Sequence, residues 1–310
     1  MPIKIPNDLP ASRQLEDEGV VLILEKDAIR QDIRPMQIAL LNLMPTKEVT
    51  ELQLARLLGG SPLQLELTLV TTGSYKPKNA PEGHLQKFYN AFHKIQHKKF
   101  DGFIITGAPV EKIPFTEVDY WQELTEILSW TQTHVHSTFA ICWGAQAAIY
   151  YHRGIGKHPL HEKAFGLYAH HVLQKNHPLV RGFDDEIYIP VSRYTAVDDI
   201  VYNQDLSLLL ASSDGQACLL SDKKYHTTYM FNHIEYDVDT LALEYERDGQ
   251  AGLGIAKPKN YFSDNNTNQT PPSRWRSHAH LLFANWINMV YQSSPHDIRD
   301  IGKKKFIKHD

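Results

Sequence analysis

The stretch Thr138-Phe139-Ala140-Ile141-Cys142-Trp143-Gly144-Ala145-Gln146-Ala147-Ala148 decides the fold of this chain. Its apolar first part predicts a short buried strand over 138–142, and the small residues that follow allow a tight turn into a helix over 146–152. A nucleophile between a strand and a helix is typical of a nucleophile elbow, here with cysteine in place of serine. The stretch therefore predicts an α/β protein with Cys142 at a strand-to-helix turn.

The chemistry of such a turn suits a nucleophilic thiol. Unpaired N–H groups at a helix N-terminus favour the thiolate form of Cys142. The N–H of Trp143 would help to stabilise an oxyanion, with a second donor from Gly107 or Ala108. A buried structural cysteine is the alternative interpretation, because free cysteines are usually core residues. Cys218 fits that alternative, whereas the small residues around Cys142 favour a functional role.

Strands and helices alternate on both sides of this stretch. Strands are predicted over 37–43, 64–70 and 100–106, and helices over 46–58, 84–97 and 117–133. The second half is richer in strands, predicted over 186–191, 206–211, 216–220 and 227–235, with helices over 241–247 and 280–291. This alternation indicates a doubly wound, mostly parallel sheet flanked by helices.

The 310 residues show no internal repeat and no convincing linker. We expect one domain over 1–297, made of an N-terminal extension (1–34) and a core (35–297). A basic tail (298–310), with three consecutive lysines at 303–305, would follow as a loosely held terminus.

Bulk properties exclude several classes of protein. The net charge of −4 gives no basic field for a nucleic acid or an anionic membrane. No stretch approaches the roughly 20 apolar residues of a membrane span, and the N-terminus lacks the apolar region of a signal peptide. Two cysteines are too few for a disulfide framework. We therefore expect a cytoplasmic protein.

A candidate base and its partner occur as His233-Ile234-Glu235. If this segment continues the strand predicted over 227–235, the two side chains point to the same face, toward the sheet's C-terminal edge. His233 would then take the proton of the nucleophile and Glu235 would orient the imidazole. With 17 histidines in the chain, such a pair also arises by chance. It therefore indicates a catalytic site only together with Cys142.

Other histidine pairs are candidate metal ligands. They occur at 134 and 136, 158 and 161, 170 and 171, and 278 and 280. None has the HExxH form or a matching cysteine cluster, so we expect no metal site.

Together these residues resemble the homoserine O-acyltransferase family of methionine biosynthesis, which has a class I glutamine amidotransferase-like (flavodoxin-like) fold. The resemblance covers nearly the whole chain to about Asp297. It is carried by Met1-Pro2-Ile3, Asp32-Ile33-Arg34-Pro35, Leu41-Asn42-Leu43-Met44-Pro45, Thr106-Gly107-Ala108-Pro109-Val110-Glu111, Cys142-Trp143-Gly144-Ala145-Gln146, Arg181-Gly182-Phe183-Asp184-Asp185, Ser192-Arg193-Tyr194, His233-Ile234-Glu235-Tyr236-Asp237 and Trp275-Arg276-Ser277-His278.

The resemblance implies a ping-pong reaction with acetyl-CoA as co-substrate and no other cofactor. Cys142 would accept the acyl group, and His233 would deprotonate the hydroxyl of L-homoserine. Family substrate positions fall on Lys163, Ser192 and Arg247, and the guanidinium of Arg247 suits a two-pronged salt bridge to an α-carboxylate. Lys47 is a weaker candidate for the same site. The expected partners are these small molecules, with a homodimer as the candidate assembly and neither nucleic acid nor membrane.

The residue at 111 separates acetyl from succinyl donors in the family, glycine accompanying succinyl. Glu111 would face the free carboxylate of a succinyl group. Two like charges about 4 Å apart repel by roughly 4 kcal/mol at an effective dielectric near 20, close to a thousandfold in rate. Glu111 therefore favours acetyl-CoA, with an exposed structural carboxylate as the alternative.

Several functions remain open from the sequence. Val191 stands where the family commonly has histidine, so a serine O-acetyltransferase of cysteine synthesis is one alternative, since a methylene distinguishes substrates by only ~1–3 kcal/mol. A homoserine O-succinyltransferase is another. A glutamine amidotransferase subunit would also use Cys-x-Gly-x-Gln with His-x-Glu. A non-catalytic or redox-sensing protein would leave Glu111 and His233 without a role.

Overall fold

The computed structural model describes residues 3–5, 9–17, 22–24, 34–74 and 82–303. Its strands are β1 (Ile3–Ile5), β2 (Leu22–Leu24), β3 (Met36–Leu41), β4 (Leu65–Thr71), β5 (Tyr89–Ala91), β6 (Phe100–Ile105), β7 (Val135–Ile141), β8 (Lys157–Val172), β9 (Glu186–Val197), β10 (Leu206–Ser212), β11 (Ala217–Asp222) and β12 (Thr227–Met230). Its α-helices are α1 (Ala11–Asp17), α3 (Lys47–Gly59), α4 (Glu82–Phe88), α5 (Phe92–Ile95), α6 (Trp121–His134), α7 (Trp143–Arg153), α8 (Thr240–Gln250) and α9 (Arg276–Ser293). Short 3₁₀ turns are η1 (Phe115–Glu117), η2 (Pro178–Val180), η3 (Ser263–Asn265) and η4 (Ile298–Asp300).

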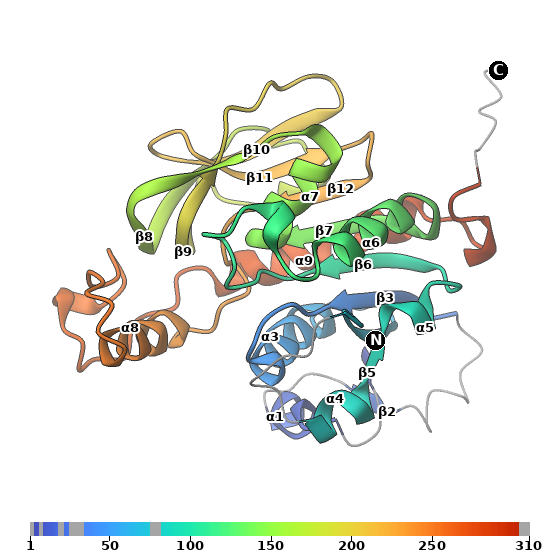
Figure 1. The fold of residues 1–310 in the computed structure, drawn as a ribbon, viewed down its shortest axis with the longest axis horizontal. Helices are drawn as coiled ribbons and strands as arrows, with labels where there is room; N and C mark the ends of the chain where they lie inside the picture. Colours follow the sequence, from blue (N-terminus) through green and yellow to red (C-terminus); the bar gives the residue numbers. More distant parts are fainter. Residues whose placement is uncertain (1–2, 6–8, 18–21, 25–33, 75–81, 304–310) are drawn as a thin grey trace.

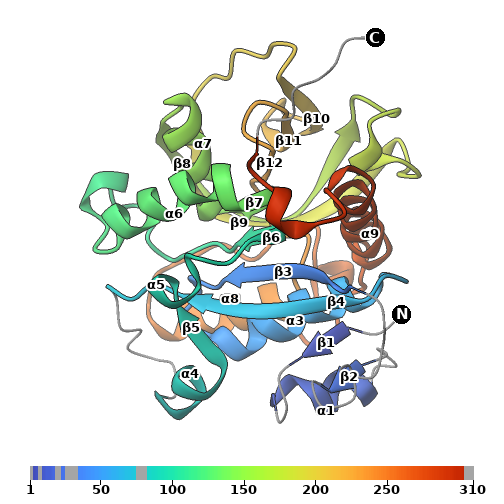
Figure 2. The same cartoon turned by 90° about the vertical axis from the view of Figure 1, so that its right-hand side faces the viewer.

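Within the described residues, the strands form one sheet in the order β2-β1-β4-β3-β6-β7-β12-β11-β10-β8-β9, with β5 beside β4. The strands from β2 to β12 in this order are parallel, and those from β12 to β9 are antiparallel. Figure 1 shows the parallel strands in the middle of the molecule and the antiparallel strands above them. Figure 2 shows β1 and β2 on the side of the molecule away from β10 and β11.

Side chains alternate between the two faces of the parallel strands, as they must in a pleated sheet. On β3, Ile38 and Leu40 pack in the core that contains α3 and α9. Their neighbours Ala39 and Leu41 pack in a second core with α6 and α7. Helices therefore cover both faces, and the prediction of a doubly wound, mostly parallel α/β fold is confirmed.

Several local features differ from the sequence-based expectation. The predicted helix over 84–97 is interrupted, because Tyr89–Ala91 pairs with Leu69–Thr71 as strand β5. The segment 157–172, for which no element was predicted, forms the long strand β8. Many of its residues are charged or histidine, so it carries a weak apolar signal, but β9 and β10 both pair with it.

The strand predicted over 227–235 is also too long. β12 ends at Met230, and His233 and Glu235 lie in the loop after it. Strand geometry therefore does not explain how these two side chains meet.

The first part of the C-terminal tail is held rather than loose. Ile301 is buried, and Lys99 Nζ donates hydrogen bonds to the carbonyl oxygens of Arg299 (2.9 Å) and Ile301. Residues 304–310, including two of the three lysines, lie outside the described residues, as does much of the predicted N-terminal extension.

Candidate functional site

Cys142 lies at a sharp turn between β7 and α7. Its backbone has φ = 49°, and its N–H donates to the carbonyl of Met230 at 2.7 Å. A Cβ at Gly144 would lie 2.5 Å from the carbonyl oxygen of Thr106, so only glycine lets α7 approach the end of β6 this closely. The sequence thus produces the strand-to-helix turn predicted for this cysteine.

The topology of the sheet brings His233 to the same place. β12 and β7 are parallel neighbours, and Met230 pairs with Ile141, the residue before Cys142. The loop after β12 therefore begins beside Cys142, and the His233 N–H fixes it by donating to the carbonyl of Pro190 at 2.9 Å.

Glu235 reaches His233 through the turn of this loop. Its Oε1 lies 2.7 Å from His233 Nδ1, and both side chains are almost fully buried. The imidazole also stacks on the ring of Tyr236, with centroids 4.1 Å apart. The other oxygen of the carboxylate, Oε2, has no hydrogen-bond partner among the described residues. Glu235 is thus committed to orienting one imidazole.

The thiol of Cys142 and the imidazole of His233 face one another across Gly107. A Cβ atom placed on Gly107 would lie 3.6 Å from His233 Cε1 and 3.7 Å from Cys142 Sγ. Burial alone would lower the pKa of His233, but charge and hydrogen-bond interactions with Cys142 and with Glu235 raise this pKa well above its ordinary value. The arrangement favours a protonated imidazole between the sulfur of Cys142 and the carboxyl group of Glu235.

Backbone donors are available beside the thiol. Among the described residues, no hydrogen-bond acceptor is found for the N–H groups of Trp143, Gly107 and Ala108. Trp143 opens α7 and Gly107 follows β6, so both belong to the turns that surround Cys142. These are the positions from which an oxyanion can be stabilised.

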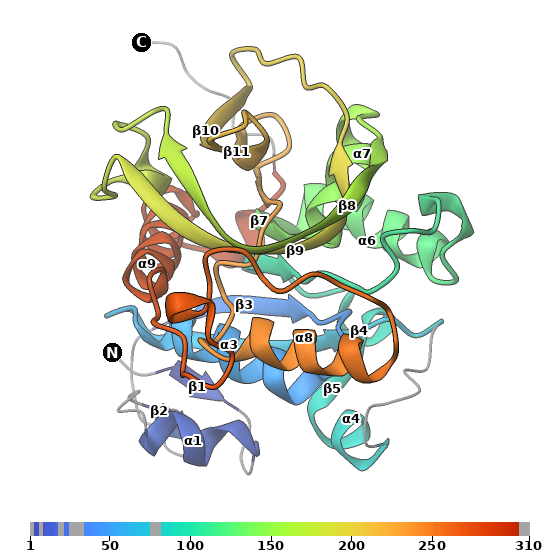
Figure 3. The same cartoon turned by 90° about the vertical axis from the view of Figure 1, so that its left-hand side faces the viewer.

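A cavity of about 330 Å³ opens above the thiol and gathers most of the predicted site. It is lined by Glu111, Cys142, Lys163, Ser192, His233 and Arg247, together with Tyr236, Glu244 and Asp248. Glu235 does not line it but supports His233 from behind. Lys163 and Ser192 come from β8 and β9, and the last part of the wall comes from α8, which Figure 3 shows in front of the parallel strands.

Helix α8 contributes a polar face of which only Arg247 was predicted from the sequence. Glu244 and Asp248 are four residues apart and share that face with Arg247. Ser192 Oγ donates to Glu244 Oε2 at 2.5 Å, and the Tyr236 hydroxyl donates to Glu244 Oε1 at 2.8 Å. The 3.6-residue period of a helix places Glu244 and Asp248 on the same face as Arg247. The sequence alone did not show that this face lines the cavity, so these two acids were missed.

Two cations of the cavity, Lys163 and Arg247, differ in how they are held. Lys163 Nζ is buried between Asp248 (3.1 Å) and Glu244 (3.5 Å). Arg247 donates from Nε (2.8 Å) and Nη2 (2.6 Å) to Asp248 Oδ1, and its side chain remains 68% exposed. The guanidinium therefore keeps donors free to bind an anion that enters the cavity.

Glu111 is fixed in the cavity wall. Its Oε2 accepts a hydrogen bond from the Tyr194 N–H at 2.8 Å and lies 3.3 Å from Thr195 Oγ1. Gln146 accepts from the same Thr195 hydroxyl at 3.1 Å, which links Glu111 to α7. A carboxylate held this way keeps its charge at one place in the cavity wall.

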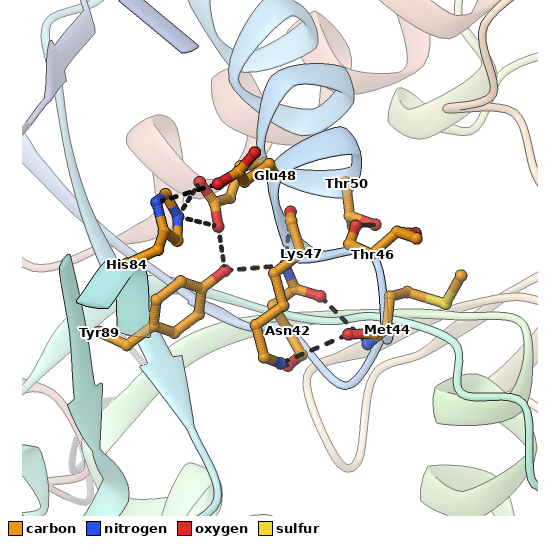
Figure 4. A network of polar contacts seen from close by, with 9 residues as sticks. Asn42, Met44, Thr46, Lys47, Glu48, Thr50, His84 and Tyr89 are labelled. Atoms are coloured by element: carbon orange, nitrogen blue, oxygen red, sulfur yellow. Dashed lines mark hydrogen bonds and ion pairs between the residues drawn. The ribbon is translucent and has the colours of Figure 1, made fainter. Parts of the chain in front are cut away.

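Lys47 and Val191 lie elsewhere. Lys47 is buried in the polar network shown in Figure 4, where its Nζ donates to the Asn42 carbonyl. It lines a neighbouring cavity rather than the one above Cys142. Burial lowers the pKa of Lys47 to about 8, although nearby Glu51 opposes the shift. Val191 is buried and does not line the cavity, whereas the next residue, Ser192, does.

Two further features are absent from the part of the chain that the structure describes. No three His, Cys, Asp or Glu side chains converge there as metal ligands. No helix there has the length and apolar character needed to cross a membrane.

Comparison with known proteins places the chain in a family. Residues 2–296 match the family model described as homoserine O-succinyltransferase. The chain belongs to this family. Members similar to it include a homoserine O-acetyltransferase of Rhizobium leguminosarum bv. trifolii, 53% identical over 97% of this chain and 99% of the relative. One of Hyphomonas neptunium with the same name is 54% identical over 98% of this chain and 100% of the relative.

The names within the homoserine O-succinyltransferase family are not uniform. A homoserine O-succinyltransferase of Pelagibacterium halotolerans is 50% identical over 97% of this chain and 99% of the relative. Solved structures with a similar fold include a glutamine amidotransferase from Thermotoga maritima (TM-score 0.50, 14% identity, 83% of this chain and 99% of that one). One from Methylobacillus flagellatus gives a TM-score of 0.51 at 11% identity, over 86% and 99%. The predicted family and the class I glutamine amidotransferase-like fold are confirmed.

Proposed function

We propose that this protein is a homoserine O-acetyltransferase that works through an acetyl-cysteine at position 142. The observation that carries the proposal is that Cys142 and His233 line one cavity while Glu235 holds His233 from behind. Relatives of the chain include proteins named homoserine O-acetyltransferase. The pathway implied by those names is methionine biosynthesis.

In the first half-reaction the sulfur of Cys142 attacks the carbonyl carbon of acetyl-CoA. The N–H groups of Trp143 and Gly107 stabilise the oxyanion of the tetrahedral intermediate. The carbon–sulfur bond to CoA then breaks, and the CoA thiolate takes the proton from His233 as it leaves. The product is an acetyl thioester on Cys142, with a neutral imidazole held by Glu235.

In the second half-reaction the L-homoserine hydroxyl gives its proton to His233, and its oxygen attacks the acetyl thioester. The new ester forms as the bond to the Cys142 sulfur breaks, which restores the thiolate and the imidazolium. Arg247 binds the α-carboxylate of homoserine, because its guanidinium is exposed at the cavity. Glu244 accepts hydrogen bonds from Ser192 and Tyr236 and supplies a negative charge for the α-ammonium.

Two features support this choice of substrates over their alternatives. Glu111 holds a carboxylate in the cavity wall, which repels the free carboxylate of a succinyl donor. Val191 replaces the family histidine, but its side chain is buried outside the cavity, so this departure does not argue for serine. The relative named homoserine O-succinyltransferase makes that enzyme the second candidate.

The proposal extends to the cofactor requirement, the cellular compartment and the assembly of the protein. Acetyl-CoA is a co-substrate, and the mechanism needs no further cofactor. The two cysteines are free and buried, which suits the reducing cytoplasm. A homodimer is the proposed assembly.

A matrix of donors and acceptors tests the substrates. Acetyl-CoA and succinyl-CoA are each combined with homoserine, serine and glutamine, and release of free thiol or ammonia is measured. Acetyl-CoA with homoserine should give the highest kcat/KM, and glutamine hydrolysis would instead indicate an amidotransferase. Glu111→Gly should raise kcat/KM for succinyl-CoA relative to acetyl-CoA by a factor approaching a thousand. If the donor preference does not move, Glu111 is not the selecting residue.

A further inference from the structure

A second cavity, of about 760 Å³, lies beside the one above Cys142. Lys112, Lys163 and Tyr194 line both, so the two spaces are continuous along the segment that carries Glu111. The volume is within the ~300–1,000 Å³ of ordinary small-molecule sites, and none of the steps above uses it.

We propose that this second cavity binds the nucleotide and phosphate end of the acyl-CoA donor. The inference rests on the proposed function, because it takes a CoA thioester to be the donor. The thioester then lies at Cys142, the pantetheine arm passes Tyr194, and the phosphates and adenine occupy the second cavity.

The charges of the second cavity fit a polyanion. Its cations are Lys112, Lys157 and Lys163, with His158 and His161 beside them. Its acids are already engaged: Glu162 pairs with Lys259 at 2.9 Å, and Glu111 accepts the Tyr194 N–H. A negative ligand is therefore attracted to this cavity, because not every positive side chain in its wall is paired with an acidic one.

Lys112 is the cation best placed to contact a phosphate. Its exposed side chain makes no ion pair with any described residue, and its Nζ lies 3.6 Å from the centroid of the Tyr194 ring. Lys157 is engaged differently, because its Nζ donates to the carbonyls of Ile113 (2.8 Å) and Glu111. Lys157 thus holds the wall shared by the two cavities, while Lys112 is free to bind.

Aromatic rings provide a surface for a purine base. Phe115 and Tyr150 both line the second cavity and stack on one another, with centroids 4.7 Å apart. Phe115 is buried and Tyr150 is half-buried, so Tyr150 is the ring of this pair that a base can reach. Flat aromatic faces bind nucleobases by stacking, with little dependence on hydrogen-bond pattern. Phosphate-binding cations and a stacking surface are thus present in one cavity.

The cavity next to Lys47 is a poorer place for this ligand. It also adjoins the site, but its volume is about 350 Å³ and its lining includes Glu117 and Asp119 against one lysine. Two acids there would repel phosphates.

The test compares two donors and one inhibitor. S-acetyl-N-acetylcysteamine is a thioester without the nucleotide, and adenosine 3′,5′-bisphosphate is part of the nucleotide without the thioester. In the wild-type protein the bisphosphate should compete with acetyl-CoA and not with the short donor, and acetyl-CoA should have the higher kcat/KM. Lys112→Glu should lower the ratio of kcat/KM for acetyl-CoA to kcat/KM for S-acetyl-N-acetylcysteamine by about tenfold or more, because the variant loses one charged phosphate contact. Inhibition by the bisphosphate should weaken for the same reason.

Lys224→Glu is the matched control. Lys224 is also exposed and also lies over a tyrosine ring, that of Tyr225, but it belongs to the far turn between β11 and β12. It should change neither the ratio nor the inhibition. An unchanged ratio in Lys112→Glu, or no competition by the bisphosphate in the wild type, overturns the proposed site. If neither thioester acetylates the wild-type protein, the proposed function itself fails, which is a distinguishable outcome.

Discussion

Single residues set the geometry of the site, and Gly144 shows this most directly. The turn after Cys142 brings the start of α7 against the carbonyls at the end of β6, at distances that leave no space for a side chain. Small residues in the sequence predicted a tight turn here. They could not show that Thr106 O is the atom a methyl group would meet, because that contact joins α7 to the residue after β6, which is far away in the sequence.

Gly144→Ala should therefore lower stability by about 2 kcal/mol or more and reduce turnover, since the backbone around Cys142 must shift. Urea unfolding and steady-state kinetics measure both effects. Gly83→Ala is the control, because a Cβ at this helical glycine meets nothing within 4 Å. Equal effects of the two substitutions would contradict the assigned role of Gly144.

At the scale of elements, the sequence predicted the helices and strands that have a clear local pattern of apolar residues. It missed those that depend on pairing with distant strands. The strand before Cys142 and the helix after it were predictable from apolar runs and small residues. The pair His233 and Glu235 was found for an incorrect reason, because it lies in a loop rather than on a strand. Strand β8 was missed, since its polar residues become extended only through pairing with β9 and β10.

Helix α8 offers a test of acceptor binding. Glu244→Gln should raise KM for homoserine about tenfold or more, because it removes the negative charge proposed to face the α-ammonium. Acetylation of Cys142 by acetyl-CoA alone should change far less. Glu246→Gln, an exposed position on the same helix, is the control and should have little effect. A larger effect on acetylation than on the homoserine step would argue against acceptor binding by Glu244.

Buried histidines on β8 and α7 make stability depend on pH. Burial lowers the pKa of His170 to about 4, and that of His152 also to about 4. The unfolded chain binds these protons below an ordinary pKa of about 6.5, and the folded chain only near 4, so stability falls as pH drops through this window. Each histidine contributes at most about 3 kcal/mol of this loss.

Urea unfolding between pH 7 and pH 4 measures how steeply the free energy of unfolding falls with pH. His170→Gln should reduce this slope without abolishing it, because His152 remains. His170 holds Asn232 at 2.9 Å, the residue before His233, so activity in the variant reports on that support as well. A slope identical to that of the wild type would show that His170 does not titrate differently on folding.

At the scale of the whole molecule, the site lies where the parallel and antiparallel parts of the sheet meet. β7 supplies Cys142, β12 leads to His233, and the antiparallel strands β8 and β9 supply Lys163 and Ser192. Composition and alternation predicted the parallel part. The strand order that brings residues 142 and 233 together depends on long-range pairing, which the sequence alone did not reveal except through the family resemblance.

The central claim is that the thiol of Cys142 carries the acetyl group between donor and acceptor. Mixing the protein with acetyl-CoA alone and analysing it by intact-protein and peptide mass spectrometry tests this directly. One acetyl group per chain should appear on Cys142 and disappear when homoserine is added. Cys218 should stay unmodified, because burial raises its pKa to about 12. Full turnover with no acetyl adduct, or an adduct that persists after homoserine is added, would contradict the mechanism.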